Sequence, residues 1–444
     1  MSMAASGGRT GGSVRPYESY LAEPKSIEET GLNVGFLYDL TLKLLYYKSD
    51  MTSLDVCDTL CLPFMNIMET VLENLKREEL IEITGSKGFG ERGYQWDITG
   101  KGIERAIQAL ERDQYVGPAP VTLDRYNAMV HVQTIGELKV GPSDVRQALS
   151  HLVLTGELIN KIGPAVNSGR SFFLYGPPGN GKTAVAKSIV RMLKGHVFIP
   201  YAINVDGQII RVFDEMNHKL IPEPPREAEK QTAPGQGPPR LDRRWARIRR
   251  PEVIVGGELT MENLDLIFDP ISKTYEAPFQ MKANNGMFVI DDFGRQQMRP
   301  QDLLNRWIVP LELRVDFLAL QTGKKIEVPF DQLIVFSTNL DPVDLVDDAF
   351  LRRIRHKLLI DFPDEKIYYE ILKRECSARN IEFPAEAFVY LMQSHYLSQN
   401  RPLRACHPRD LLDQIQDIAT YFGTRPALTK QLIDAACAGY FADL

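Results

Sequence analysis

The amino-acid sequence predicts an α/β fold in which a parallel sheet is flanked by helices, with a small α+β domain before it and a helical part after it. Between residues 151 and 362, apolar strand-like runs alternate with helical patterns, most clearly at 172–175, 287–290 and 333–337. Residues 31–115 show three helical patterns, a hairpin pattern and a fourth helix. After residue 363 the chain shows helical periodicity alone, which predicts a separate helical domain.

Composition narrows the class of protein further. The 444 residues carry 52 Lys and Arg against 58 Asp and Glu, a net charge of −6, which argues against a surface built to coat nucleic acid. The five cysteines form no Cys-x-x-Cys pair, so we expect a reduced compartment and no disulfide framework. No apolar run reaches the roughly 18 residues of a membrane span, and the first residues resemble no signal peptide. These features predict a cytoplasmic protein.

The chain divides into five predicted parts. Residues 1–30 begin with a Gly/Ser-rich stretch and are expected to form a flexible tail, and residues 31–115 the α+β domain. Residues 116–150 contain several turn-forming residues and are expected to form a linker. Residues 151–362 form the α/β unit, with a Pro- and Arg-rich insert at about 220–255, and residues 363–444 form the helical domain.

The order of elements in residues 31–115 resembles a winged helix-turn-helix domain of bacterial regulators. The Gly-rich segment 85–93 separates two alternating apolar runs, and Thr99 precedes the last helix. DNA binding would require basic residues on the third helix, yet residues 31–110 carry 8 basic and 12 acidic residues. Docking of a protein is therefore the favoured role, with DNA binding as the alternative.

A phosphate-binding loop follows the strand pattern at 172–175. The segment fits G-x-x-x-x-G-K-[ST] and precedes an amphipathic helix, which is the context that the motif requires. Glycines allow backbone N–H groups to approach phosphates, Lys182 would hold the β- and γ-phosphates of ATP, and the Thr183 hydroxyl would bind Mg²⁺. The predicted nucleotide-binding residues are Gly176, Pro177, Pro178, Gly179, Asn180, Gly181, Lys182, Thr183 and Ala184.

Two carboxylates end the next buried strand pattern, at 287–290. Asp291 is the expected second anchor for Mg²⁺, and Asp292 is expected to orient or deprotonate the attacking water. An apolar strand can end in Asp for other reasons. Asp291 and Asp292 therefore indicate a metal site only in combination with the phosphate-binding loop.

From residue 140 onward the chain resembles the AAA+ ATPases. The segment 333–339 resembles the strand that carries the family's sensor 1 residue, here Asn339. Residues 348–353 resemble the arginine-finger segment, with Arg352 or Arg353 as the finger, and residues 407–411 resemble the sensor 2 helix start, with Arg409. The resemblance implies an AAA+ core with a C-terminal helical lid that hydrolyses ATP between subunits of a homo-oligomeric ring, with a hexamer as the expected ring size. The family usually has Glu where this chain has Asp292, which implies weak or partner-dependent hydrolysis.

Two features narrow the resemblance. Residues 315–320 and 325–330 predict a hairpin directly before the sensor 1 strand, as in the pre-sensor-1-hairpin branch of AAA+ proteins. The run 197–207 and the long insert together resemble bacterial chaperone-type ATPases associated with Flp pilus assembly. Residues 240–250 contain six arginines around Trp245, with Asp242 as the acid. We expect this Arg cluster to be exposed and to bind an anionic ligand or partner, or else to pair with carboxylates at a subunit interface.

Together these patterns predict an ATPase ring that remodels a protein partner. The alternative is a DNA-associated regulator in which the winged helix binds DNA and ATP drives assembly. Salt-dependent binding of duplex DNA would favour the alternative.

Overall fold

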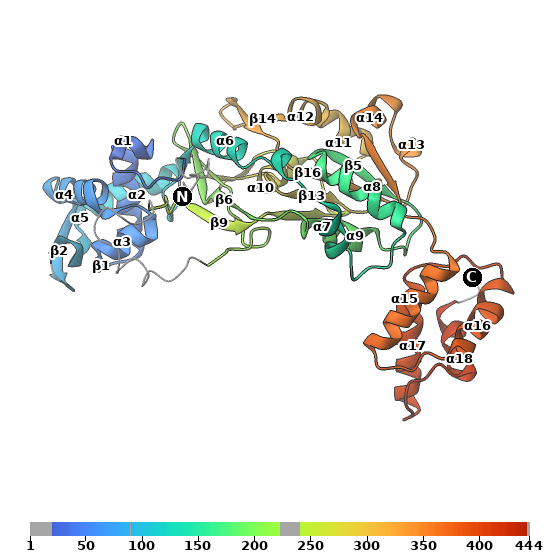
Figure 1. Ribbon diagram of the computed structural model, residues 1–444. Helices are drawn as coiled ribbons and strands as arrows, with labels where there is room; N and C mark the ends of the chain where they lie inside the picture. The colour runs from blue at the N-terminus through green and yellow to red at the C-terminus, as the bar shows by residue number, and fades with distance from the viewer. Residues whose placement is uncertain (1–19, 89, 223–239, 442–444) are drawn as a thin grey trace, which may run out of the picture.

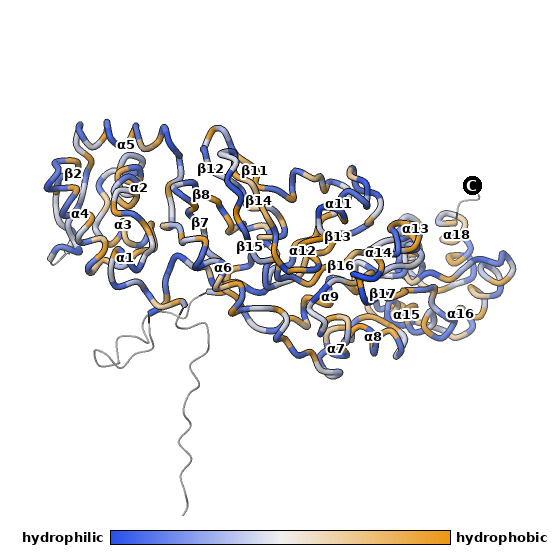
Figure 2. Tube along the Cα trace, turned by 90° about the horizontal axis from the view of Figure 1, so that it is seen from above, coloured by the Kyte–Doolittle hydropathy of each residue, from blue (hydrophilic) through white to orange (hydrophobic). Residues whose placement is uncertain are grey.

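The computed structural model describes residues 20–88, 90–222 and 240–441. Three parts follow one another along a long axis, namely an N-terminal domain, a central body and a helical C-terminal domain (Figure 1). Seen from above, the body itself divides into a second sheet beside the N-terminal domain and a central sheet toward the C-terminal helices (Figure 2).

The N-terminal domain has the predicted order of helices and hairpin. Its helices pack against a small sheet of order β1-β3-β2 around one apolar core. Trp96 is buried there and its indole N–H donates to Ser53 Oγ at 2.8 Å, while Thr99 caps α5 as expected. The elements are α1 (Ile27–Thr30), α2 (Val34–Tyr47), β1 (Met51–Thr52), α3 (Ser53–Leu60), η1 (Phe64–Met68), α4 (Glu69–Arg77), β2 (Ile81–Ser86), η2 (Glu91–Gly93), β3 (Tyr94–Ile98) and α5 (Gly100–Arg112).

The predicted tail 1–30 is too long. Leu21 is fully buried, and its carbonyl accepts a hydrogen bond from the N–H of Asp242 at 2.7 Å. The N–H of Glu23 donates to the carbonyl of Arg240 at 2.9 Å. Residues 20–30 are therefore part of the packed structure, and residues 1–19 lie outside the described residues.

The central sheet has five parallel strands in the order β10-β13-β16-β5-β17. Alternate side chains point to opposite faces, so Phe172 and Leu174 pack with α7, α8 and α9, whereas Phe173 packs with α11 and α12. The elements are α7 (Pro142–Ala148), α8 (Gly156–Asn167), β5 (Ser171–Tyr175), α9 (Lys182–Val190), β10 (Glu252–Val255), α10 (Phe279–Lys282), β13 (Met287–Ile290), α11 (Pro300–Arg306), α12 (Ile308–Leu313), β16 (Leu333–Thr338), α13 (Pro342–Leu345), α14 (Asp348–Arg353) and β17 (His356–Leu359). The predicted fold class, an α/β P-loop core with a parallel sheet flanked by helices, is confirmed.

A second sheet, of order β11-β12-β8-β7-β4, is built mainly from the long segment between Lys182 and Asp291. It shares an apolar core with α6 and with the predicted hairpin, which forms as β14 and β15. The elements are β4 (Val121–Thr122), α6 (Leu123–Val132), η3 (Ile135–Glu137), β6 (His196–Pro200), β7 (Ala202–Val205), β8 (Gln208–Arg211), β9 (Trp245–Arg249), η5 (Glu262–Leu264), β11 (Ile267–Asp269), β12 (Thr274–Glu276), β14 (Val315–Ala319) and β15 (Lys325–Pro329).

Two predicted boundaries in this region are wrong. Residues 116–150 are not a plain linker, because β4 pairs with β7 and α6 packs into the core of the second sheet. The insert 220–255 extends too far, because β9 pairs with β6 and β10 forms the edge of the central sheet. The turn-forming residues in these segments mark the ends of short helices and strands. The sequence therefore predicted each whole segment as irregular, and these elements were missed.

The C-terminal domain is helical throughout its described residues, as predicted. Its helices enclose one apolar core, in which the hydroxyls of Tyr368 and Tyr396 lie 2.7 Å apart and Tyr396 contacts Nδ1 of His407. Burial lowers the pKa of His407 to about 4, so this ring is neutral near pH 7. The elements are α15 (Glu365–Ala378), α16 (Ala385–Leu391), η6 (Met392–Leu397), α17 (His407–Tyr421) and α18 (Lys430–Tyr440).

Candidate nucleotide-binding site

The phosphate loop joins β5 to the N-terminus of α9. Gly176 has φ 138°, and a Cβ added there would lie 2.2 Å from the carbonyl oxygen of Ile360 on the neighbouring strand segment. Gly179 and Gly181 have φ 81° and 88°, in the left-handed region that favours glycine. The glycines of the motif are therefore required by the local backbone as well as by the approach of a phosphate.

Lys182 is turned into its own loop. The residue is 7% exposed, and Nζ donates to the carbonyl oxygens of Gly176 and Pro177 at 2.8 and 2.9 Å. Burial lowers the pKa of Lys182, and the carboxylates of Asp292 and Asp291 oppose that change. The ammonium group is thus held inside the loop. There it can exchange its hydrogen bonds to carbonyl oxygens for hydrogen bonds to phosphate oxygens.

Asp291 lies at the end of β13 and is held by two hydroxyl groups. Thr183 Oγ1 donates to Asp291 Oδ2 at 2.8 Å, and Ser337 Oγ donates to Oδ1 at 2.7 Å. The hydroxyl and carboxylate oxygens of Thr183 and Asp291 are the kind of hard ligands that Mg²⁺ prefers, so the donor set fits this ion. Ser337 is a residue that the sequence argument missed, because its contact with Asp291 depends on the pairing of β16 with β13.

Asp292 and Asn339 also lie together. Asn339 Nδ2 donates to Asp292 Oδ1 at 3.0 Å. Both residues follow the carboxyl ends of neighbouring strands, and Asp292 has a left-handed backbone with φ 49°. The strand order explains the pairing, because β16 lies between β5 and β13 and therefore places Asn339 beside both the loop and the acids.

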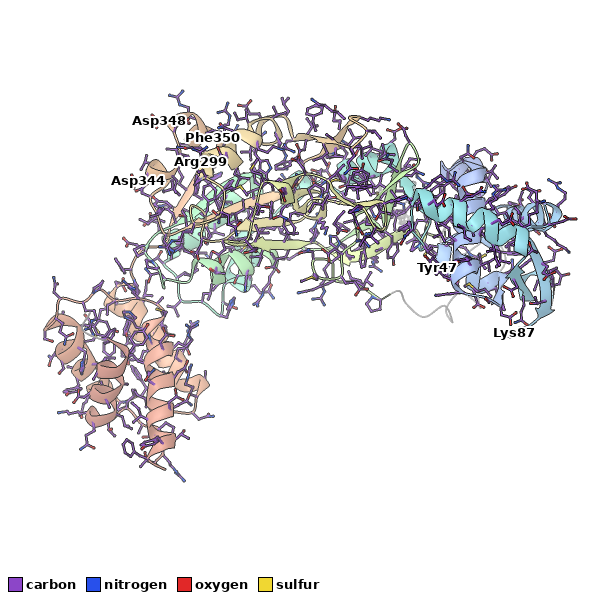
Figure 3. The ribbon with its side chains drawn as sticks, turned by 180° about the vertical axis from the view of Figure 1, so that it is seen from behind. Tyr47, Lys87, Arg299, Asp344, Asp348 and Phe350 are labelled. Carbon is purple, nitrogen blue, oxygen red and sulfur yellow. The ribbon has the colours of Figure 1, made fainter. Side chains whose placement is uncertain are left out.

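The two candidate finger residues differ in their surroundings. Arg353 Nε donates to Glu312 at 2.6 Å, and its guanidinium lies 5.5 Å from the centre of the Phe350 ring. Arg352 is exposed, and within the described part of the chain no hydrogen bond or ion pair is recorded for it. Figure 3 places Asp348 and Phe350 of α14 at the outer edge of the body, at the end opposite the N-terminal domain. The structure does not bring Arg352 or Arg353 to the loop of its own chain.

The C-terminal domain reaches the loop through a different segment from the one predicted. Arg409 is exposed and donates to its neighbour Asp410 at 2.8 and 2.9 Å. The contact to the loop is made by the preceding residues, where the N–H of Cys406 donates to Gly179 O at 2.8 Å and the N–H of Ala405 donates to Asn180 Oδ1 at 3.1 Å. The side chain of Arg404 lies beside Gly179 as well. Asn180 thus connects the loop to the C-terminal domain.

The predicted exposed Arg cluster at 240–250 is wrong. Residues 245–249 form β9, in which Trp245 is buried, and Arg244 is fully buried with its guanidinium against Asp242. Arg243 pairs with Asp58 of α3 at 2.8 Å, and Arg250 Nη1 donates to Asn285 O. Arg243, Arg244 and Arg250 hold parts of this chain together, while Arg240 and Arg249 are exposed. A charge count along the sequence could not show that alternate side chains of a strand are buried.

A family model and a curated relative each match part of this chain. A family model described as "Domain of unknown function (DUF8689)" matches residues 364–439, which are the helical domain. A protein of Corynebacterium jeikeium (strain K411) described as an AAA ATPase forming ring-shaped complexes is 25% identical over an alignment of 181 residues, and the match covers 34% of this chain. The chain covers about a third, 33%, of the length of that relative. The sequence similarity supports a relationship to AAA+ ATPases.

Among solved structures, this chain matches RuvB and NtrX at low sequence identity and low TM-score. The RuvB Holliday junction branch migration motor of Thermotoga maritima is 14% identical, with 71% of this chain and 70% of that chain covered and a TM-score of 0.32. NtrX of Brucella abortus in complex with ADP is 16% identical, with 75% and 65% covered and a TM-score of 0.37. Within the described residues, no helix is both long and apolar enough to cross a membrane.

Proposed function

We propose that this chain binds and hydrolyses ATP as an AAA+ protein that assembles into a homo-oligomeric ring, a hexamer, and remodels a protein partner. The observation that carries the proposal is the joint placement of two pairs at one edge of the sheet, Thr183 with Asp291 and Asn339 with Asp292. A P-loop sequence alone would not bring these four side chains together. Lys182 is held in the adjacent loop, so one site holds every group that the proposed chemistry needs on this chain.

Each residue then has a role set by its position. Lys182 and the loop N–H groups bind the phosphates, and Thr183 and Asp291 hold Mg²⁺, which neutralises charge on the β- and γ-phosphates when bound. Asp292 and Asn339 orient the attacking water, because the amide fixes one carboxylate oxygen and leaves the other available to accept a proton. Asp292 is one methylene shorter than Glu, so we expect slow basal turnover.

Docking of a protein is the role that we propose for the N-terminal domain. Glu73, Glu78 and Glu79 are exposed on and just after α4, the helix that would have to approach DNA phosphates in the alternative function. Acidic side chains in that position repel a duplex and attract a basic protein surface.

The test compares three variants of the full chain. Lys182→Ala should lose measurable ATP binding, and Asp292→Asn should keep ATP binding while losing turnover. Lys187→Ala, an exposed lysine on the same helix, should change neither and serves as the matched control. Tight ATP binding by Lys182→Ala would reject the site. Partners retained by ATP-loaded Asp292→Asn, and not by Lys182→Ala, would identify the client.

A further inference from the structure

A cavity of about 430 Å³ lies between the N-terminal domain and the second sheet, away from the nucleotide site. One wall is the connector of residues 115–118, and the others come from the end of β8, the residues after it, and the end of β12. We call this cavity the junction pocket. Its volume is large enough for a small ligand or for one side chain of a bound polypeptide, since small-molecule sites in proteins measure roughly 300–1,000 Å³.

Three aromatic rings line the junction pocket, and the backbone holds them in place. The Tyr115 hydroxyl donates to the carbonyl of Pro118 at 2.7 Å, which closes the connector on itself. The rings of Tyr201 and Phe213 lie 5.1 Å apart, and the N–H of Phe213 donates to the carbonyl of Tyr201 at 3.3 Å. Aromatic faces in fixed positions attract cations through their quadrupoles.

The charged residues of the pocket are mostly acidic. Asp214, Glu215 and Glu276 line it, against one arginine, Arg211. Arg211 pairs with Glu276 at 2.9 Å, and a buried lysine behind the wall, Lys282, pairs with Asp214 at 2.9 Å and with Glu276. Glu215 is exposed, and no ion pair is recorded for it among the described residues.

The pKa shifts of Asp214 and His218 keep the net charge around the pocket negative. The pKa of Asp214 is lowered because hydrogen bonds from Lys282 and backbone groups outweigh the cost of its burial. His218 is buried beside Phe213, and burial lowers its pKa, so it adds no positive charge near pH 7. With Lys282 included, three carboxylates face two cations, and a third cation would balance the group.

Exposed apolar side chains adjoin the pocket on two sides. Met216 follows Glu215 directly and is 91% exposed, and Ile271 is 75% exposed in the turn before β12. The carbonyl of Ser272 accepts a hydrogen bond from the N–H of Gln114 at 2.8 Å, which places this turn beside the connector. A free amine would leave these side chains in water, whereas residues flanking a basic side chain in a polypeptide would cover them.

We propose that the junction pocket binds an arginine side chain of a partner polypeptide, with the guanidinium against the aromatic rings and the carboxylates of Glu215 and Glu276. Arginine fits better than lysine because its planar group stacks on aromatic faces and also pairs with carboxylates through parallel hydrogen bonds. The connector forms one wall, so the bound polypeptide contacts the N-terminal domain and the second sheet together. The proposal concerns partner recognition and holds whether or not the chain hydrolyses ATP.

The test uses labelled peptides and the full chain. The probe is Ala-Phe-Arg-Phe-Ala with a fluorescent label, measured by anisotropy, beside the same peptide with Lys or Glu in place of Arg. We expect the Arg peptide to bind most tightly and the Glu peptide most weakly. Glu215→Lys should weaken binding of the Arg peptide by about 10-fold or more, because it places a like charge in the pocket. Arg211→Gln should strengthen binding, since it frees Glu276 from a competing cation.

Two controls complete the design. Glu137→Lys makes the same change of charge at an exposed position outside the pocket and should leave peptide affinity unchanged. ATP binding by each variant shows that the central domain is intact, which separates failure of the pocket from failure of the nucleotide site. Equal binding of the three peptides, an unchanged affinity in Glu215→Lys, or displacement of the Arg peptide by spermidine at lower concentration than by unlabelled peptide would overturn the proposal.

Discussion

Gly179 is, with Asn180, one of the residues through which the phosphate loop contacts the C-terminal domain. A Cβ at this position would lie 2.7 Å from Cys406 Sγ, and the left-handed backbone adds strain for any other residue. We expect Gly179→Ala to weaken ATP binding, because the segment at Cys406 must move away from the loop. Calorimetric titration with a non-hydrolysable ATP analogue measures the loss.

A second substitution distinguishes the effect of the steric contact with Cys406 from the effect of backbone strain at position 179. Cys406→Ala should restore part of the affinity of Gly179→Ala, since it removes the sulfur and leaves the backbone strain. Gly181→Ala has a similar φ but no atom within 4 Å of the added Cβ, so Cys406→Ala should not rescue it. Purely additive effects of Gly179→Ala and Cys406→Ala would contradict a direct contact.

Arg244 is the most deeply buried arginine at the junction of the N-terminal domain and the body. Its guanidinium donates three hydrogen bonds to the carboxylate of Asp242 and also donates to the carbonyls of Thr30 and Pro120 at 2.9 and 3.3 Å. Arg244→Met should lower the free energy of unfolding by about 3 kcal/mol, because among the described residues it leaves the buried Asp242 with Arg125 alone as a cationic partner.

Urea unfolding followed by tryptophan fluorescence tests this expectation, with Arg243→Ala as the neighbouring control. The Arg243–Asp58 pair is partly exposed, so its loss should cost less than about 1 kcal/mol. Equal losses in the two variants would show that burial of the Arg244–Asp242 pair is not what stabilises the junction.

Among the elements, α14 carries two adjacent arginines with opposite surroundings. Arg353 is held by Glu312 and lies over Phe350, whereas Arg352 is exposed. If a neighbouring subunit supplies the finger, Arg352→Ala should lower turnover by about 10³-fold or more while ATP binding is kept. Arg353→Ala should have a smaller effect on turnover, and Glu312→Gln should reproduce it, because both variants release the same anchoring pair. Steady-state ATPase assays rank the three, and a larger loss in Arg353→Ala would assign the finger to that residue instead.

The elements that the sequence predicted well are those with a local physical signature. The loop at 176–183 needs glycines and a strand–helix context, and the strands 287–290 and 333–337 are continuous apolar runs, so each was visible in the chain. Their strand order was not visible, and it is that order which brings Ser337 to Asp291. The Arg cluster was misjudged for a related reason, since pairing of β9 with β6 buries Trp245 and no local pattern encodes that partner.

At the scale of the whole molecule, the two halves of the proposed catalytic site lie in different places. The loop and the acids occupy one edge of the central sheet, while α14 lies at the outer edge of the body (Figure 3). Among the described residues, no recorded contact joins the arginines of α14 to the loop. If another copy of the chain supplies Arg352, the site is complete only in an assembly, and the proposed ring and the proposed turnover then depend on each other.

Turnover per subunit should therefore rise with protein concentration, because dilution separates the copies that complete each site. Turnover by a mixture of two inactive variants tests the dependence on a neighbouring subunit more directly. A subunit with Arg352→Ala keeps an intact loop, and a subunit with Lys182→Ala keeps an intact Arg352, so each supplies what its neighbour lacks. An equal mixture of the two inactive variants should regain turnover. Each variant alone should stay inactive, and so should a mixture of either variant with a chain that carries both substitutions. Turnover that is independent of concentration, with no recovery in the mixture, would show that a single chain completes its own site.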